Sequence, residues 1–238
     1  MKEVVFKLVN PDFVYAYEKP LPASRHVPEW YKNTPLRIPG ERVDGIAPFG
    51  GSNNMTIKAC VPFLDIMTAG YIFVTPCDVE VSILDGSYQI RWLVDNYEPT
   101  TTHHKDQLGE LPVDSKFDDG AFKWENPWRM ETPKGYSTMF VHPVNRYDLP
   151  FRSFGGIVET DTYNLPVNFP FQITKVPEDK YIIPKGTPVI QAIPFKREDW
   201  KSSEILLDYS EHAKNYDSLK SVITRSYRNM FWKKKKYT

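Results

Sequence analysis

Proline is the residue that most restricts what this chain can fold into. The sequence has 21 prolines in 238 residues, against only 12 glycines. A proline fixes its own φ angle and lacks an N–H donor, so it interrupts the hydrogen bonds of a helix interior or a central strand. The chain is therefore expected to form many short extended segments joined by corners rather than long helices.

Short segments rich in β-branched and aromatic residues recur from residue 55 onward. The strongest pattern is a hairpin over residues 79–92, in which Asp85 and Gly86 suit the positive φ angles of a two-residue turn. Residues 41–54 and 95–121 are expected to be loops. Further strands are expected at residues 2–8, 56–61, 70–74, 122–124, 136–142, 154–160, 167–174, 181–183 and 189–195. Short strands separated by turns predict a mainly β protein, a sandwich or barrel.

The two ends of the chain differ from this β pattern. Residues 1–55 are predicted to form an extended N-terminal arm, with a short helix that begins at Pro28. Residues 203–232 have few helix breakers, apolar residues at helical spacing, and a serine at 202 or 203 as a suitable N-cap. We therefore expect three parts: the arm at 1–55, a β core at 56–200, and a C-terminal helix packed on that core with a tail, at 201–238.

Composition limits the class of protein. The 30 basic and 30 acidic residues cancel, which does not indicate a globally basic nucleic-acid binder. Cys60 and Cys77 are too few for a disulfide framework and are expected to be reduced thiols. The N-terminus is too short and charged for a signal peptide, and no apolar run approaches the roughly 18 residues of a membrane helix. We expect a soluble cytoplasmic protein, in the host cytoplasm or in a virion if it is viral.

Two strand segments carry a family resemblance. Residues 156–161 read Gly-Ile-Val-Glu-Thr-Asp, and residues 186–191 read Gly-Thr-Pro-Val-Ile-Gln. They resemble the hairpin Gly-Val-Ile-Asp-x-Asp-Tyr and the later strand Gly-x-x-Ile-Ala-Gln of the deoxyuridine triphosphatase family. The resemblance covers residues 56–197. It implies a distorted jelly-roll-like β-sandwich, which the deoxycytidine triphosphate deaminases share, and a homotrimer with its sites between subunits.

The resemblance also implies a nucleotide site. In this family the first Asp of the hairpin activates the attacking water and the Tyr packs against the deoxyribose. Glu159 stands at the water-activating position, and Tyr163 sits one residue late. A Mg²⁺ ion would be held mostly by the phosphates. The implied catalytic residues are Glu159 and Asp161, and the implied ligand-binding residues are Asn145, Arg146, Tyr163 and Gln191. The structural alternatives are that Glu159 and Asp161 are solvent-facing turn residues and that Asn145 lies at a turn or strand end. Arg146 would then be a solvated side chain, and Gln191 would bond backbone across a subunit interface.

Other segments depart from the family pattern. Residues 69–73 read Ala-Gly-Tyr-Ile-Phe, with Ile72 where the family has an Asp, and the Arg-Ser-Ser phosphate turn is reduced to Arg146 without its serines. The family's Gly-rich C-terminal arm is absent. A non-catalytic structural or accessory protein that kept the fold and lost the pocket is therefore a second reading. Residues 124–195 are also similar to a family of uncharacterised proteins in tailed phages and bacteria, which implies a phage context without an activity.

Histidines suggest a third reading. His104 and Asp106 have the His-x-Asp spacing of the non-haem iron facial triad, and His142 on a later strand is a candidate third ligand. Arg152 follows at about the distance where iron oxygenases place the Arg that binds 2-oxoglutarate. This pattern predicts Fe²⁺ and 2-oxoglutarate as cofactors. The alternative is that a spacing this short has arisen by accident.

The C-terminal tail combines charge with aromatic rings. Residues 225–238 carry six basic and no acidic side chains, interleaved with Tyr227, Phe231, Trp232 and Tyr237. Such a segment can bind nucleic acid through phosphates and stacking, cover a ligand in a neighbouring subunit, or be a solvated helix end. Aromatic anchors in both end segments, Trp30, Tyr31, Phe231 and Trp232, are consistent with self-assembly.

Overall fold

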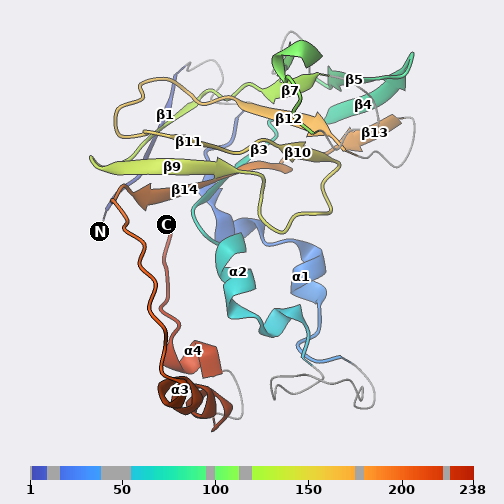
Figure 1. Ribbon diagram of the computed structural model, residues 1–238. Helices are drawn as coiled ribbons and strands as arrows, with labels where there is room; N and C mark the ends of the chain where they lie inside the picture. Colours follow the sequence, from blue (N-terminus) through green and yellow to red (C-terminus); the bar gives the residue numbers. More distant parts are fainter. Residues whose placement is uncertain are drawn as a thin grey trace.

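The computed structural model describes residues 2–9, 17–38, 55–94, 100–112, 120–174, 180–221 and 226–238. The protein is mainly β, with 35% strand and 18% helix, which confirms the predicted fold class. The strands form four antiparallel sheets around a shared core, and the α-helices lie on one side of these layers (Figure 1). Among the described residues, no helix has the length and apolar character needed to cross a membrane.

The largest sheet has five strands and carries most of the segments that the family resemblance singled out. Its order is β11 (Gly156–Val158), β9 (Tyr136–Val141), β14 (Pro188–Lys196), β3 (Tyr71–Val74) and β2 (Leu21–Pro22). The central strand β14 pairs with both β9 and β3, and the side chains from 188 to 192 are buried. The two resembling segments, 156–161 and 186–191, therefore belong to one sheet but are separated by β9.

The other three sheets complete the β layers. A four-stranded sheet has the order β10 (Phe151–Ser153), β12 (Phe169–Ile173), β7 (Ala121–Trp124) and β6 (Thr100–His103). A three-stranded sheet consists of β13 (Lys180–Ile183), β4 (Val79–Leu84) and β5 (Ser87–Trp92), and a two-stranded sheet pairs β1 (Val5–Leu8) with β8 (Trp128–Glu131). The turn between β4 and β5 has φ of 50° at Asp85 and 75° at Gly86, as predicted for this hairpin.

Aromatic side chains join the sheets into one core. Phe73 of the five-stranded sheet meets Phe169 of the four-stranded sheet edge-on, with ring centroids 5.3 Å apart. Trp124 stacks on Phe171 at 3.9 Å and meets Trp92 of the three-stranded sheet at 5.5 Å. Trp124 therefore contacts rings from two sheets, and its side chain is one of the main contributors to core packing.

The N-terminal segment belongs to the β layers in part. Of the predicted arm, β1 and β2 pair with strands of the core, and a 3-10 helix (Ala23–His26) and α1 (Glu29–Asn33) follow. Helix α1 begins after Pro28, as predicted, because proline suits the start of a helix where no N–H is required. The predicted loop at 41–54 lies outside the described residues.

Two local predictions are wrong. Residues 56–61, expected to be a strand, form a 3-10 helix (Ile57–Ala59) and the start of α2 (Val61–Met67). The Thr56 hydroxyl accepts the Lys58 N–H at the first of these helices, and Pro62 lies in the first turn of the second. Residues 95–121, expected to be a loop, contain β6, whose β-branched threonines pair with β7.

The C-terminal helix is present, but it does not pack on the β core as expected. Helix α3 (Tyr209–Ser221) projects from the β layers and is followed by α4 (Ser226–Met230) (Figure 1). The described side chains of α3 are exposed except for Ala213, because most are polar and offer no continuous apolar face. The tail then returns to the body, where the Trp232 indole donates a hydrogen bond to Asp65 of α2 at 2.8 Å.

Replacement of Trp124 tests the role of the aromatic core. We expect Trp124→Ala to lower the free energy of unfolding by about 3–5 kcal/mol, since it leaves a cavity between two sheets. Trp124→Phe keeps an aromatic ring and removes a buried indole N–H that has no partner among the described residues, so it should cost much less. Urea unfolding followed by circular dichroism measures both. Equal losses for the two variants would contradict this account.

Candidate functional site

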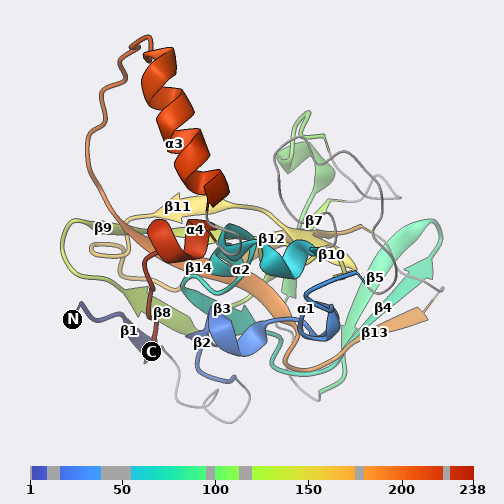
Figure 2. The same ribbon diagram turned by 90° about the horizontal axis from the view of Figure 1, so that it is seen from below.

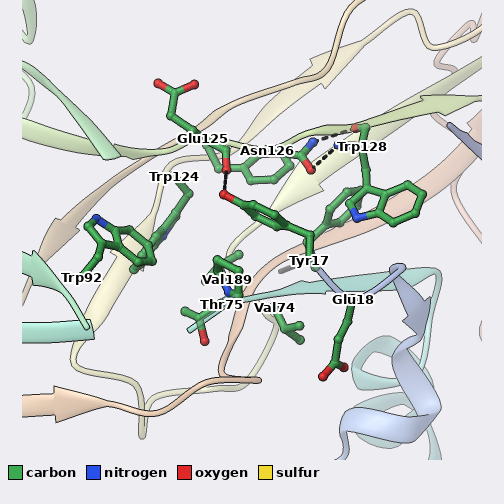
Figure 3. Close-up of a pocket in the computed structure, with 13 residues that line it drawn as sticks. Tyr17, Glu18, Val74, Thr75, Trp92, Trp124, Glu125, Asn126, Trp128 and Val189 are labelled. Carbon is green, nitrogen blue, oxygen red and sulfur yellow. Dashed lines mark hydrogen bonds between the residues drawn. The ribbon is translucent and has the colours of Figure 1, made fainter. Parts of the chain in front are cut away.

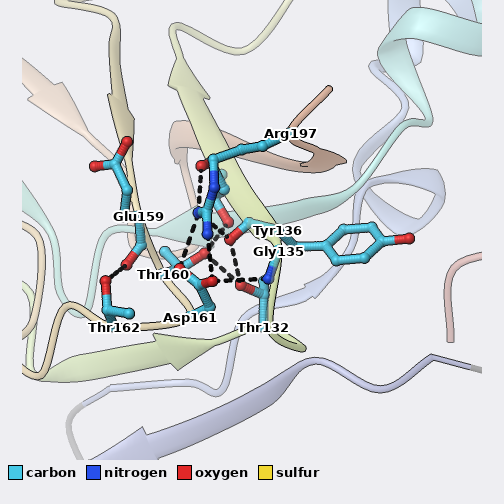
Figure 4. A network of polar contacts seen from close by, with 10 residues as sticks. Thr132, Gly135, Tyr136, Glu159, Thr160, Asp161, Thr162 and Arg197 are labelled. Carbon is cyan, nitrogen blue, oxygen red and sulfur yellow. Dashed lines mark hydrogen bonds and ion pairs between the residues drawn. The ribbon is translucent and has the colours of Figure 1, made fainter. Parts of the chain in front are cut away.

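The turn after β11 holds both of the implied catalytic residues, and one of them, Asp161, lies in a dense polar network (Figure 4). Thr160 is buried, and its hydroxyl bonds the hydroxyls of Thr132 and Thr138, each at 2.8 Å. Asp161 accepts the Gly135 N–H at 2.8 Å and a bidentate pair of bonds from the Arg197 guanidinium, one of them at 2.9 Å. These contacts fix the hairpin against the ends of β9 and β14.

Asp161 is therefore engaged as a structural carboxylate. The Arg197 guanidinium and then the Gly135 N–H lower the pKa of Asp161 to about 2 from an ordinary value of 3.8. Arg197 also donates to the Tyr136 carbonyl and to the Ser137 hydroxyl. A carboxylate with so low a pKa is a weak base near neutral pH, and both of its oxygens already accept hydrogen bonds. The arrangement holds the chain rather than a water or a metal.

Glu159, at the implied water-activating position, has a different environment. Its side chain is exposed and points away from the Asp161–Arg197 pair (Figure 4). Among the described residues, no hydrogen bond or ion pair is formed by its carboxylate, while its backbone carbonyl accepts the N–H groups of Thr162 and Tyr163. Tyr163 is also exposed. Of the two implied catalytic residues, Glu159 alone has a carboxylate that is free to act on a ligand.

The implied phosphate-binding residues lie in the turn after β9. The Arg146 N–H bonds the Pro143 carbonyl, and Asn145 takes a left-handed φ of 63°, which asparagine tolerates well. The Arg146 guanidinium bonds both carboxylate oxygens of Asp148, at 2.9 Å each. Its positive charge is thus neutralised locally. Arg146 also borders an open groove of about 280 Å³ that includes Tyr181 and Lys185.

Gln191 uses its whole side-chain amide inside the chain. Its Nε2 group donates to the carbonyls of Ile66 and Ala69 at 2.8 and 2.7 Å, and its Oε1 atom accepts the Val144 N–H at 3.0 Å. The residue is 1% exposed. Gln191 therefore joins β14 to the end of α2 and to the turn after β9, and its amide is not presented to a ligand.

The structure separates the residues that the resemblance brings together. Val158 pairs with Thr138 near the start of β9, so Glu159 lies beyond that end, whereas Arg146 lies beyond Val141 at the other end. The six residues of β9 span about 17 Å at roughly 3.4 Å per residue. Within one chain, the implied base and the implied phosphate ligand are therefore at opposite ends of a strand.

The predicted iron ligands are not assembled. His104 and Asp106 lie at the exposed end of β6, where the Nδ1 atom of His104 accepts the Asp106 N–H as a helix cap. His142 is half-buried at the far end of β9, and the described residues include no group of three His, Cys, Asp or Glu side chains that could hold a metal. The Fe²⁺ site predicted from these three residues is thus not supported by their positions.

His142 has a structural role of its own. Its Nδ1 atom accepts the Ser153 N–H at 3.3 Å, so in the neutral ring the Nε2 atom carries the proton and donates to the Arg146 carbonyl at 3.2 Å. Burial is the main cause that lowers the pKa of His142, and the nearby Arg152 and Arg146 add to it. Arg152 is exposed. Both ring nitrogens are engaged, which leaves no lone pair for a metal.

An aromatic pocket lies where the N-terminal segment crosses the β layers (Figure 3). The Tyr17 hydroxyl donates to the Glu125 carbonyl at 3.1 Å and closes one side. The indole N–H groups of Trp124 and Trp128 have no partner among the described residues. The remaining space is about 20 Å³, enough for a single water molecule. The pocket is thus part of the packed core, with room for a water near two free donors.

Sequence reasoning missed a larger groove. It has a volume of about 380 Å³ and is bordered by Lys19, Arg25, Tyr71 and Tyr237, among others. The sequence indicates this groove only in part, through the basic and aromatic character of residues 225–238. The other residues are far from the tail in the sequence and no local pattern links them, so only the folded chain brings them together.

The pH dependence of stability tests the Asp161–Arg197 pair. Because the pKa of Asp161 is lowered in the fold, its contribution to stability is present above pH 3.8 and is lost as the pH falls towards 2. We expect Asp161→Asn to lower the melting temperature at pH 7, with the two melting temperatures converging as the pH approaches 2. Thermal unfolding from pH 7 to 2 measures this difference. A difference that does not depend on pH would contradict the account.

Replacement of Gln191 separates a structural role from a ligand-binding one. Gln191→Leu keeps the size of the side chain but leaves three backbone groups without their partner, each of which costs about 1–3 kcal/mol if it stays buried. We expect a marked loss in the free energy of unfolding, measured in urea. Asn145→Gly, at a left-handed position in the nearby turn, is the matched control and should change stability little. A variant as stable as the wild type would contradict the structural role.

Comparison of the chain with protein-family models, with curated proteins and with solved structures finds no match. The resemblance to the deoxyuridine triphosphatase family therefore stays a prediction from the sequence.

Proposed function

We propose that the protein is a non-catalytic assembly module that associates with further copies of itself through a C-terminal arm. This arm is defined as residues 198–221 and includes α3. The observation that carries the proposal is a run of large apolar and aromatic side chains that are exposed on it: Trp200, Ile205, Leu206, Leu207 and Tyr209. Leu206 is 97% exposed. Clustered apolar surface of this kind is typical of interaction sites.

The state of the implied nucleotide site supports a non-catalytic role. Asp161 is bound to Arg197, Gln191 is bound to three backbone groups, and Arg146 is bound to Asp148. These side chains are satisfied without a ligand. Apart from Glu159, whose carboxylate is free, these engaged side chains leave the site with few of the free donors and acceptors that binding a nucleotide requires.

A complementary surface lies on the same chain. We call it the β11 edge: strand β11 and the exposed side chains of Ile157, Tyr163 and Leu165. Strand β11 is at the margin of its sheet, so one row of its backbone groups has no strand partner among the described residues. Residues 202–207 of the arm are neither helical nor paired. An extended apolar segment and an open sheet edge are the two halves of a strand-addition interface.

The arm and the β11 edge are different surfaces, so the association is heterologous. Each copy gives an arm to one neighbour and receives an arm from another, and such contacts form a closed ring if the rotation permits. A trimer is the ring that the family resemblance implies. The chemistry that drives it is the removal of the exposed apolar side chains from water.

Nucleotide hydrolysis is a second candidate, favoured by one observation. The Glu159 carboxylate is exposed, has no partner among the described residues, and adjoins the β11 edge. In a ring, a neighbouring copy would place its own side chains beside the Glu159 carboxylate. The test is hydrolysis of deoxynucleoside triphosphates with Mg²⁺ by the assembled protein, and Glu159→Gln should abolish it. His104 and Asp106 lie next to each other, with 3.3 Å between Nδ1 and Oδ2, but no third ligating side chain among the described residues completes a metal site with them, so the oxygenase is not favoured.

The assembly is tested by the mass of the protein in solution. We expect the wild type to have a multiple of the chain mass by light scattering after gel filtration, and Ile205→Ser with Leu206→Ser to shift it to the monomer. Ile157→Asp on the β11 edge should have the same effect. Leu84→Ser removes an exposed leucine from the distant β4–β5 hairpin and is the matched control. A monomeric wild type, or arm variants with unchanged mass, would refute the proposal.

A further inference from the structure

The C-terminal tail forms one wall of a groove with the N-terminal segment. Figure 2 shows the end of the chain lying close to β1 and β2, near the N-terminus. The groove of about 380 Å³ is bordered by these strands, by residues 19–25 and by the tail. Its volume falls in the range of roughly 300–1,000 Å³ that is usual for small-molecule sites.

The tail is held in place by specific contacts. Asp65 of α2 accepts a hydrogen bond from the Trp232 indole at 2.8 Å and forms an ion pair with Lys235 at 2.6 Å. Tyr237 meets Tyr71 edge-to-face, with ring centroids 6.0 Å apart. The wall that Tyr237 provides is therefore anchored at three points and is not a frayed end.

Aromatic rings line the inner part of the groove. Tyr71 is buried and also meets Phe6 edge-to-face at 5.2 Å, so three rings form a continuous aromatic surface. Burial, and secondarily Tyr237, raises the pKa of the Tyr71 hydroxyl above its ordinary value of 10.0. The hydroxyl is thus neutral at physiological pH and does not repel an anion. Flat aromatic ligands bind such surfaces by stacking and edge contacts.

Positive charge lines the outer part of the same groove. Lys19 and Arg25 are exposed, neither forms an ion pair among the described residues, and no Asp or Glu side chain borders the groove. Some cations elsewhere have a carboxylate partner, as Lys7 has Glu131 and Arg197 has Asp161, while others, such as Lys233 and Lys234 of the tail, have none among the described residues. What distinguishes Lys19 and Arg25 is their place: two cations without a carboxylate partner border the same groove as three aromatic rings.

We propose that this groove binds a mononucleotide, with its base against the rings of Phe6, Tyr71 and Tyr237 and its phosphates at Lys19 and Arg25. Arginine and lysine are the usual partners of phosphate oxygens, and the rings offer faces and edges to a base. The volume suits one nucleotide, whereas a nucleic-acid strand needs a continuous channel for several. The site is distinct from the Glu159 hairpin and does not depend on the assembly through the C-terminal arm.

The test is binding of a fluorescent deoxyadenosine triphosphate analogue to the full-length protein, followed by anisotropy. We expect saturable binding that unlabelled deoxyadenosine triphosphate displaces, and Lys19→Ala with Arg25→Ala should weaken it at least about tenfold. Lys233→Ala with Lys234→Ala removes the same charge from exposed tail positions that do not border the groove. This control should bind within about twofold of the wild type, since long-range charge effects are screened by salt.

The contribution of the aromatic rings of the groove to binding is tested with separate variants. Tyr237→Phe keeps the ring and should bind like the wild type, while Tyr237→Ala should bind more weakly, and melting temperatures check that both are folded. Pyrophosphate and a single-stranded oligothymidylate serve as competitors. The proposal fails if the wild type does not bind, if the groove and control variants lose affinity equally, if pyrophosphate competes as well as the nucleotide, or if the oligothymidylate binds more tightly.

Discussion

The positions of helix α2 and of the C-terminal tail depend on the hydrogen bonds of the Gln191 side chain. They fix the end of α2 against the central strand of the largest sheet. Helix α2 carries Asp65, which in turn holds Trp232 and Lys235 of the tail. Tyr237 then reaches Tyr71 and completes the groove. One buried amide on β14 thus helps to position a helix, the tail and one wall of a candidate binding surface.

The β architecture could be predicted from the sequence because its signals are local. Asp85 and Gly86 specify the tightest hairpin through their φ angles, and most strand segments alternate or cluster β-branched residues. The segment at 56–61 alternates in the same way, yet it is helical. The Thr56 cap and Pro62 in the first turn of α2 favour a helix more strongly than six alternating residues favour a strand. Periodicity over six residues does not distinguish the two structures when the flanking residues favour a helix.

The candidate site could be predicted only in part because strand register is not local. The sequence gives the hairpin around Asp161 correctly, as a turn that follows a strand. It does not give Arg197, some 36 residues later, as the partner that makes this carboxylate structural. Likewise, the sequence indicates a turn at Arg146 and a hairpin at Glu159, but it does not indicate that the two residues lie at opposite ends of β9. In this protein, the resemblance of a motif to a family predicts the backbone conformation of the segment better than it predicts the chemical role of its side chains.

The C-terminal arm lies between two segments of the chain that are bound to the body. It leaves the body after β14, where Arg197 is bound to Asp161, and it returns where Trp232 is bound to Asp65. A loop with fixed ends loses less conformational entropy when it docks than a free tail of equal length. It also means that a protease that cuts the arm once leaves two fragments still held to the same body. The nick would be visible only after denaturation, and the two new ends would be free to exchange between molecules.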